Sequence, residues 1–311
     1  MLILGRKYKF TPLELQRLHK KFKNIAIVRY RNRPQEEVLK QLQDETNQNA
    51  FDMLVLNTKA KVGNDIIKYL TNLQFEKRNK EIKIISIEHF LEEFLHKCYI
   101  PDNHTDLHFL ADIRPYNAFE YGLKRAIDYI GITILFFITW PILIYARNRI
   151  KKESPGTSIF KQLRVGKNNQ EFICVKFRSM RLDAEANGAQ FASENDPRVF
   201  KWGETMRKTR IDELPQMLNV LRGDMHFIGP RPERKVWTDK FEKQIPYYSE
   251  RHLVKPGITG WAQVMYPYGA NAEDAKQKLM YDLYYIKHWS LLLELKVIWK
   301  TVLVVVGRRG V

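Results

Sequence analysis

TMRKTRIDELPQMLNVLRGDMHFIGPRP, residues 205–232, brings a cationic run, an acidic pair and a proline-bounded arginine into one segment. Arg207 belongs to the cationic run, Asp212 and Glu213 form the acidic pair, and Arg231 lies between two prolines. A guanidinium in a rigid turn loses little conformational freedom when it grips a phosphate with two hydrogen bonds. Carboxylates beside such cations suit a divalent cation and a phosphorylated ligand. We therefore expect this segment to form the centre of a phosphate-handling site.

The acidic pair also has a purely structural explanation. Together with Thr209, Asp212 and Glu213 resemble the start of a helix, where acidic side chains stabilise the helix dipole without any catalysis. Arg231 would then lie in an ordinary rigid turn. The combination of the acidic pair with the cationic run, the turn and an apolar segment earlier in the chain favours the catalytic interpretation.

Length and composition indicate about two folded domains and an anionic partner. The chain has 311 residues, of which 44% are hydrophobic, so a mainly disordered protein is excluded. A net charge of +17 suits nucleic acid, a phosphorylated metabolite or an acidic membrane surface. Cys98 and Cys174 form no CxxC pair, so we expect a reducing compartment and no cysteine metal site. The apolar run at the N-terminus is too short for a signal peptide.

Residues 1–112 are expected to form a small α/β domain followed by a linker. Thr11, Pro12 and Glu14 predict a helix start with a capping box. Strands and helices then alternate in the order βαβαβα, which favours a parallel, Rossmann-like sheet. The expected strands are 24–30, 51–57 and 82–87, and the expected helices after the first are 34–46, 64–78 and 88–96. No GxGxxG sequence follows a strand, so no dinucleotide is assigned to this domain.

Residues 126–146 are expected to enter the membrane. The stretch Tyr129–Ala146 has no charged residue, which is more typical of a membrane helix than of a buried soluble one. Pro141 removes a backbone hydrogen bond and kinks such a helix, and basic residues flank the stretch on both sides. Both features favour a re-entrant helix that returns to the cytoplasmic face, with a straight, tilted span as the alternative. The flanking basic residues are Lys124, Arg125, Arg147, Arg149, Lys151 and Lys152.

A hairpin is expected after this helix. Extended runs over 159–164 and 171–177 surround a turn at 166–169. The hairpin presents Lys176 and Arg178 near one edge. These two residues either bind a diphosphate or simply line the strand edge, and the sequence leaves both alternatives open.

Helical patterns dominate the rest of the chain. Residues 214–221 and 272–288 are helical in pattern, and Asp282 in the second is either a polar group near the nucleotide or metal or a solvated helix residue. Residues 291–306 are apolar but interrupted by charges on one side, which predicts an amphipathic helix at the membrane interface. The interrupting charges are Glu294, Lys296 and Lys300.

Several motifs occur in an order that is typical of one family. They are KRAID (124–128), FKQLRVG (160–166), KFRSM (176–180), the segment 207–232 and VKPGITGWAQV (254–264). Together they resemble the bacterial sugar transferases, the monotopic polyprenol-phosphate phosphoglycosyl transferases that begin many surface-glycan pathways. The resemblance covers residues 117–311 within an expected catalytic domain, 113–311. The tail motifs YGA (268–270) and YDLYY (281–285) resemble members from exopolysaccharide clusters.

The resemblance implies a reaction and roles for individual residues. Sugar-1-phosphate would pass from a UDP-sugar to undecaprenyl phosphate through a covalent aspartyl intermediate, with Mg²⁺ as cofactor and UMP as product. Asp212 matches the nucleophile and Glu213 the carboxylate that holds the metal. Arg207 and Arg231 match arginines of the phosphate-binding region, and Pro141 matches the helix-breaking proline.

The resemblance also implies a location and partners. The protein would lie at the bacterial inner membrane, in contact with lipid, with its catalytic domain on the cytoplasmic face. One departure is Trp140, because relatives often carry a serine before the proline. A serine hydroxyl can satisfy a carbonyl freed by the kink, and the indole of Trp140 does so less easily.

Two other functions are weighed against this one. A nucleic-acid-binding module would need basic residues on one face with exposed aromatics, whereas here they flank an apolar stretch and an acidic pair, so no nucleic-acid partner is expected. A non-catalytic scaffold for glycan assembly is disfavoured by the intact Asp212–Glu213 pair. The sequence leaves the sugar open among glucose, galactose and N-acetylated donors, and it leaves a homo-oligomer open.

Overall fold

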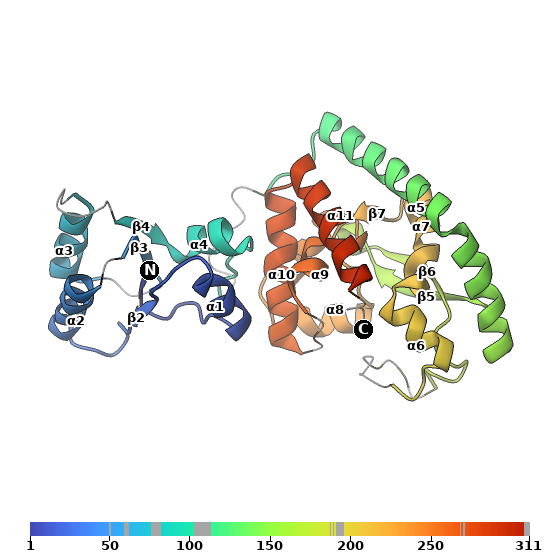
Figure 1. The fold of residues 1–311 in the computed structure, drawn as a ribbon, viewed down its shortest axis with the longest axis horizontal. Coiled ribbons are helices and arrows are strands. Elements are labelled where there is room, and N and C mark those ends of the chain that lie inside the picture. The colour runs from blue at the N-terminus through green and yellow to red at the C-terminus, as the bar shows by residue number, and fades with distance from the viewer. Residues whose placement is uncertain are drawn as a thin grey trace. The chain divides into compact units, whose positions relative to one another are not determined.

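The computed structural model (Figure 1) describes residues 1–49, 51–58, 62–75, 82–102, 113–186, 188, 190, 196–267, 269 and 271–307. The chain forms two compact units, Met1–Tyr99 and Ile100–Val311. The first is a small α/β unit, and the second carries the long apolar helix and the acidic pair.

The first unit is built on a parallel sheet with the strand order β2-β1-β3-β4. Its strands are β1 (Leu2–Leu4), β2 (Ala26–Val28), β3 (Met53–Leu56) and β4 (Lys83–Ser86). The predicted parallel α/β arrangement is confirmed. Strand β1, which lies inside the sheet, was not predicted, because a fully buried three-residue strand shows no polar alternation.

The helices of this unit are α1 (Pro12–His19), α2 (Gln35–Gln48), α3 (Asn64–Phe75) and α4 (Ile87–Phe90). Helix α1 begins with the predicted capping box, in which Thr11 and Glu14 each accept a hydrogen bond from the other's backbone N–H. The predicted end of the helix over 64–78 lies beyond Phe75, outside the described residues.

The helix predicted over 88–96 is present, but it changes type along its length. Helix α4 passes directly into a π-helical turn, η1 (Leu91–Leu95), which ends at His96 in the left-handed conformation (φ 55°). Leu91 and Leu95 are both buried, so apolar packing holds a turn that the local pattern did not distinguish from an α-helix.

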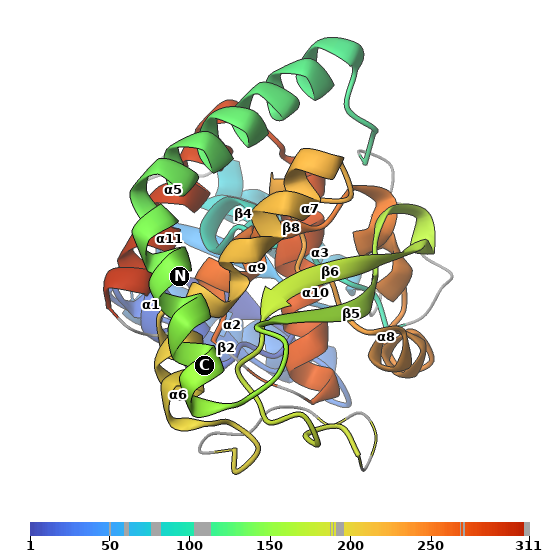
Figure 2. The same cartoon turned by 90° about the vertical axis from the view of Figure 1, so that its right-hand side faces the viewer.

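The second unit packs against one long helix, α5 (Ala118–Glu153). A capping box of Asn117 and Glu120 starts it. The helix continues through Pro141, and its ribbon changes direction part-way along, as both views show (Figures 1 and 2). Among the described residues, α5 alone is long and apolar enough to cross a membrane, and only 17% of its most apolar window is buried.

One face of α5 lies on the second unit along much of its length. The middle of the helix packs through Ile132 on a cluster that includes Met217 and Met225. Its C-terminal part packs through Ile150 on a cluster that includes Phe177. Both parts of the helix are therefore fixed to the same compact unit.

The two basic residues that precede the apolar stretch are engaged in ion pairs. Lys124 is fully buried, with its Nζ 2.8 Å from Glu294 Oε2, and Arg125 Nη1 lies 3.0 Å from Asp128 Oδ2. The tertiary fold thus pairs both basic residues of this flank with carboxylates.

The remaining strands form two pairs. The predicted hairpin is confirmed as β5 (Ile159–Val165) antiparallel to β6 (Glu171–Phe177), and β7 (His226–Ile228) lies parallel to β8 (Gly257–Thr259). The helices are α6 (Lys201–Lys208), α7 (Met217–Arg222), α8 (Lys235–Glu242), α9 (Trp261–Met265), α10 (Ala272–Lys287) and α11 (Leu291–Val306). The 3₁₀ segments are η3 (Lys167–Asn169), η4 (Ile211–Gln216) and η5 (Tyr248–Leu253).

Two helical predictions need correction. The segment predicted as helical over 214–221 starts inside the 3₁₀ helix η4, which contains Pro215, and becomes α-helical only at Met217. Glu294 does not share a solvated side of α11 with Lys296, because it is buried against Lys124. The exposed face of α11 is instead largely apolar and carries Leu292, Leu295, Trp299, Val302 and Leu303. Of the expected YGA motif, residues 268 and 270 lie outside the described part of the chain.

Candidate active site

The acidic pair lies on a tight turn between two α-helices. Helix α6 ends at Lys208, and Arg210 adopts a left-handed conformation (φ 60°) that turns the chain into η4. Thr209 does not start η4: it follows the end of α6, and its hydroxyl donates back to the carbonyl of Thr205 at 2.7 Å. Successive side chains of a 3₁₀ helix point about 120° apart, so Asp212 and Glu213 meet different surroundings.

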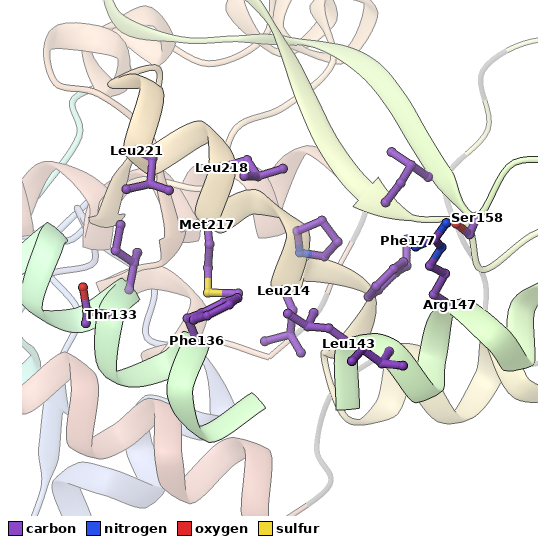
Figure 3. Close-up of a pocket in the computed structure, with 14 residues that line it drawn as sticks. Thr133, Phe136, Leu143, Arg147, Ser158, Phe177, Leu214, Met217, Leu218 and Leu221 are labelled. Carbon is purple, nitrogen blue, oxygen red and sulfur yellow. The ribbon is translucent and has the colours of Figure 1, made fainter. Parts of the chain in front are cut away.

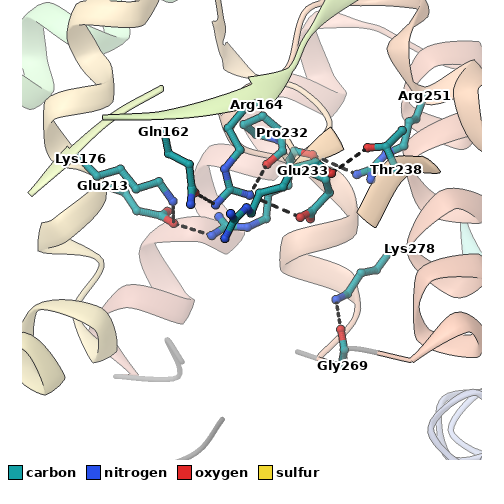
Figure 4. A network of polar contacts seen from close by, with 12 residues as sticks. Gln162, Arg164, Lys176, Glu213, Pro232, Glu233, Thr238, Arg251, Gly269 and Lys278 are labelled. Atoms are coloured by element: carbon teal, nitrogen blue, oxygen red, sulfur yellow. Dashed lines mark hydrogen bonds and ion pairs between the residues drawn. The ribbon is translucent and has the colours of Figure 1, made fainter. Parts of the chain in front are cut away.

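Glu213 is the buried centre of a group of cations (Figure 4). Its Oε1 accepts a 2.7 Å hydrogen bond from Arg231 Nη2 and lies 3.5 Å from Arg210 Nη1 and 3.6 Å from Lys176 Nζ. Burial acts to raise the pKa of Glu213, but the three cations outweigh it and hold that pKa well below its usual range. Glu213 is therefore ionised and orders the cations around it.

Asp212 has the opposite environment. Its Oδ1 is buried and has no hydrogen-bond partner among the described residues. Burial and the charge of Glu213 raise the pKa of Asp212 to about 6, against the lowering effect of Lys176, Arg210 and Arg207. Buried polar atoms without a partner are uncommon in native folds and are typical of catalytic or ion-binding groups. The two adjacent carboxyls thus have pKa values displaced in opposite directions, which suits two different roles.

Arg231 is held by a turn that the backbone fixes rigidly. The N–H of Gly257 donates to the carbonyl of Pro230 at 2.9 Å. A Cβ atom on Gly229 would lie 2.6 Å from the carbonyl oxygen of Lys255, so the close approach of the two segments requires glycine there. The guanidinium of Arg231 is therefore presented from a clamped backbone.

Arg164 belongs to the same network and was not predicted (Figure 4). Its Nη1 donates to the carbonyl of Pro232 at 3.2 Å and lies 3.6 Å from Glu233 Oε2, while its buried Nε has no partner among the described residues. Because Phe160 pairs with Lys176 across the hairpin, the two-residue period places Arg164 on the face of Lys176. The two-residue period along FKQLRVG (160–166) is the sequence signal from which Arg164 could have been predicted.

Asp282 is connected to the network through Arg251. It is buried, and its Oδ2 accepts a 2.8 Å hydrogen bond from Arg251 Nη2, which also donates to the carbonyl of Arg231 at 3.1 Å. Burial raises the pKa of Asp282 to about 6. The alternative of a solvated helix residue is wrong, and Asp282 supports the turn that holds Arg231.

Arg178 and Arg207 are placed differently from each other. Arg178 Nε donates to the carbonyl of Thr157 at 2.7 Å, and the rest of its guanidinium binds the turn at Ser154, after α5. The structure does not bring it to Glu213. Arg207 makes no side-chain hydrogen bond or ion pair among the described residues, and its charge acts on Asp212 from α6. Arg207 is thus available to an anionic ligand, whereas Arg178 is engaged in the fold.

The carboxylates are too few to form a closed metal site. Among the described residues no group of three or more His, Cys, Asp or Glu side chains could hold a metal ion. Mg²⁺ commonly uses one or two carboxylates together with phosphate oxygens of the substrate and waters. The unpartnered Oδ1 of Asp212 fits an ion that arrives with a diphosphate.

An apolar groove of about 700 Å³ lies between α5 and the turn that carries the acidic pair (Figure 3). Leu214 and Pro215 of η4 line it, together with residues of α5, α7 and the ends of the hairpin. Arg147 is its one charged lining residue. The groove is therefore amphipathic, with a long apolar wall and a single cation.

Comparison with known proteins gives a consistent result. The profile of the bacterial sugar transferase family matches residues 119–308. The chain is 48% identical over 180 residues to a UDP-N-acetylgalactosamine-undecaprenyl-phosphate N-acetylgalactosaminephosphotransferase of Aeromonas hydrophila, covering 58% of this chain and 43% of that protein. It is 41% identical over 189 residues to a UDP-glucose:undecaprenyl-phosphate glucose-1-phosphate transferase of Xanthomonas campestris pv. campestris, covering 60% and 39%.

A shorter relative is matched almost completely. The chain is 38% identical over 186 residues to the exopolysaccharide production protein PSS of Rhizobium leguminosarum bv. phaseoli, covering 58% of this chain and 93% of that protein. By contrast, the chain spans only about two fifths of the length of the Aeromonas and Xanthomonas relatives. All three alignments are shorter than 200 residues.

Proposed function

The chain belongs to the bacterial sugar transferase family, and from this premise we propose that it transfers sugar-1-phosphate from a UDP-sugar to undecaprenyl phosphate with release of UMP. The names of the relatives support donor and acceptor classes of this kind. The observation that carries the proposal is the unpartnered Oδ1 of Asp212 beside a set of fixed cations. The proposed reaction is the first membrane step of the synthesis of an exopolysaccharide or another surface glycan.

In the first step the carboxylate oxygen of Asp212 attacks the β-phosphorus of the UDP-sugar. The bond from that phosphorus to the oxygen bridging to the α-phosphate breaks, and its electron pair leaves with UMP. The sugar phosphate remains on Asp212 as an acyl phosphate. An acyl phosphate is reactive enough to pass its phosphoryl group onward, which makes a carboxylate suitable for this role.

In the second step an oxygen of undecaprenyl phosphate attacks the same phosphorus. The bond to the Asp212 oxygen breaks, the carboxylate is restored and the sugar is left on undecaprenyl diphosphate. No net redox change occurs, and the carboxylate must be ionised at the start of each cycle. Although the pKa of Asp212 is raised, to about 6, it stays below neutral pH, so the carboxylate is mostly ionised at pH 7 and above.

The cations serve the nonbridging oxygens of the diphosphate. Arg231 is rigidly presented, Arg207 has no described partner, and Lys176 is held beside Glu213. Preorganised donors of this kind stabilise developing charge without reorganising during the reaction. When bound by Asp212 or Glu213, Mg²⁺ would neutralise the diphosphate and polarise its phosphorus–oxygen bonds.

The proposal includes a re-entrant α5 at the inner membrane, with 113–311 as the catalytic domain on the cytoplasmic face. Lys124 near the start of α5 and Ile150 near its end are both buried against the same compact unit. A helix fixed at both ends to one water-facing unit returns to the side from which it entered. The bend around Pro141 and the exposed apolar surface of α5 support this arrangement.

In this proposal residues 1–112 form a Rossmann-like accessory domain and a linker. Its parallel sheet supports an α/β unit of that kind. The acidic pair and the cations around it all lie in the second unit, so the reaction is assigned to that unit.

Mass spectrometry of the intact protein tests the covalent step. With UDP-sugars supplied one at a time and no acceptor, the wild-type chain should gain the mass of one sugar phosphate and release one UMP. Asp212→Asn should do neither, whereas Asp239→Asn, at an exposed surface pair with Lys235, should behave as wild type. Near-normal turnover by Asp212→Asn would disprove the assignment of the nucleophile.

A further inference from the structure

The apolar groove beside α5 has two unlike ends (Figure 3). Arg147, Ser158 and Phe177 gather at one end, and Thr133 and Leu221 lie at the other. Arg147 is exposed and makes no ion pair or hydrogen bond among the described residues. A long apolar wall that ends at one available guanidinium matches a ligand with a hydrocarbon chain and a single anionic head.

The groove reaches the acidic pair through two separate elements. Leu214 and Pro215 follow directly after Glu213 in η4 and form part of the groove wall. From the hairpin, Phe177 lines the groove, and its neighbour Lys176 lies 3.6 Å from Glu213 Oε1. The groove wall and the candidate active site are therefore built from neighbouring residues of the same two elements, η4 and β6.

The groove is also continuous with the exposed face of α5. Its lining residues Phe136 and Ile144 are 50% and 54% exposed, on a helix that is mostly unburied. A ligand can therefore enter sideways from the hydrocarbon region without passing through water. The volume of about 700 Å³ lies within the range of ligand-binding pockets.

We propose that this groove binds the isoprenoid chain of the acceptor, with the acceptor phosphate drawn toward Arg147 and the cations near Glu213. The inference rests on the proposed function and adds the acceptor's binding site to it. The acceptor is favoured over a membrane phospholipid because Leu214 and Pro215 of the groove wall directly follow the acidic pair, and because the groove offers one cation at one end. The chain would thus fix the distance of the acceptor phosphate from Asp212.

A matched pair of substitutions on α5 tests the groove. Ile144 lines it and Ile142 does not, although both are exposed isoleucines two positions apart. Ile144→Trp should narrow the groove and raise the KM for undecaprenyl phosphate about tenfold, an effect equivalent to ~1.4 kcal/mol. It should leave the acceptor-free burst of UMP intact. Ile142→Trp should change neither.

A second pair tests the polar end. Arg147→Gln should raise the same KM, and Lys151→Gln, which removes an exposed cation of the same helix outside the groove, should not. If Ile144→Trp prevents folding, Leu218→Trp on α7 offers the same obstruction from the opposite wall. Equal effects of the groove variants and their controls on the acceptor KM would overturn the proposal.

Binding without turnover separates this inference from the proposed function. Native mass spectrometry of the detergent-solubilised chain with added undecaprenyl phosphate should show one bound acceptor for wild type and Ile142→Trp, and loss of it for Ile144→Trp. That pattern supports the groove even if no UDP-sugar yields UMP. Retention of phosphatidylglycerol in preference to undecaprenyl phosphate would overturn it.

Discussion

Lys124 on the apolar helix α5 forms a fully buried ion pair with Glu294 on α11, with their charged atoms 2.8 Å apart. The same ammonium donates a 2.7 Å hydrogen bond to the carbonyl of Ile228, the residue before the turn that carries Arg231. Tyr285 and Trp289 also donate to Glu294. One buried lysine thus ties α5, α11 and the turn that carries Arg231 together.

Loss of Glu294 should destabilise this junction strongly. Glu294→Met leaves the Lys124 ammonium buried without its counter-charge, which typically costs about 3–5 kcal/mol. Thermal unfolding in detergent should show the loss, and the exposed Lys296→Met on the same helix is the control. The double variant Lys124→Met/Glu294→Met should recover part of the stability. Additive losses from the two changes would contradict the coupling.

Asp212→Asn should raise stability while it abolishes turnover. The pKa of Asp212 is raised from 3.8 to about 6, so the ionised carboxylate destabilises the folded state at neutral pH. That cost disappears as the pH falls below the ordinary aspartate pKa. The Tm of the variant should therefore exceed that of wild type at neutral pH, by about 2–4 °C for each kcal/mol relieved, and approach it near pH 4. A lower Tm at neutral pH would contradict the unpartnered state of Oδ1.

Activity should fall on the acid side with an apparent pKa near 6. In the proposed mechanism only the ionised form of Asp212 attacks phosphorus, and Glu213 stays ionised because its pKa is held low. The pH dependence of kcat/KM measures this group in the free enzyme. Lys176→Met removes a cation that lowers the pKa of Asp212, so the acid limb should move to higher pH. The exposed Lys161→Met on the same hairpin should leave the limb in place.

Arg231→Lys should impair donor use while the protein still folds. Lysine keeps the charge beside Glu213 but cannot form paired hydrogen bonds to a phosphate. A hydrogen bond to a charged group contributes about 1.5–3 kcal/mol, so kcat/KM for the UDP-sugar should fall about 10–100-fold. Arg234→Lys, whose side chain pairs with Glu185, is the control. An unchanged kcat/KM would remove Arg231 from the donor site.

Several elements of the fold can be predicted from residues that are close together in the sequence. The capping box at Thr11, the hairpin around 166–169 and the long apolar helix depend on residues close together in sequence, and all three are present. Strand β1 was not predicted because a short, fully buried strand shows no alternation of apolar and polar residues. Arg164 was not predicted because its position on the same face as Lys176 follows only from the pairing of Phe160 with Lys176 across the hairpin.

The sequence by itself determined the family, the catalytic-type motif and the helix that carries Pro141, because these are patterns of neighbouring residues. Only the tertiary structure decided that Lys124 is a buried partner of Glu294, 170 residues away, and not a free flanking charge. It likewise decided that Arg178 supports a turn while Arg231 meets Glu213. The physical reason is that a charge's burial and partner depend on which distant segments the fold brings within a few ångströms, and local sequence does not encode that.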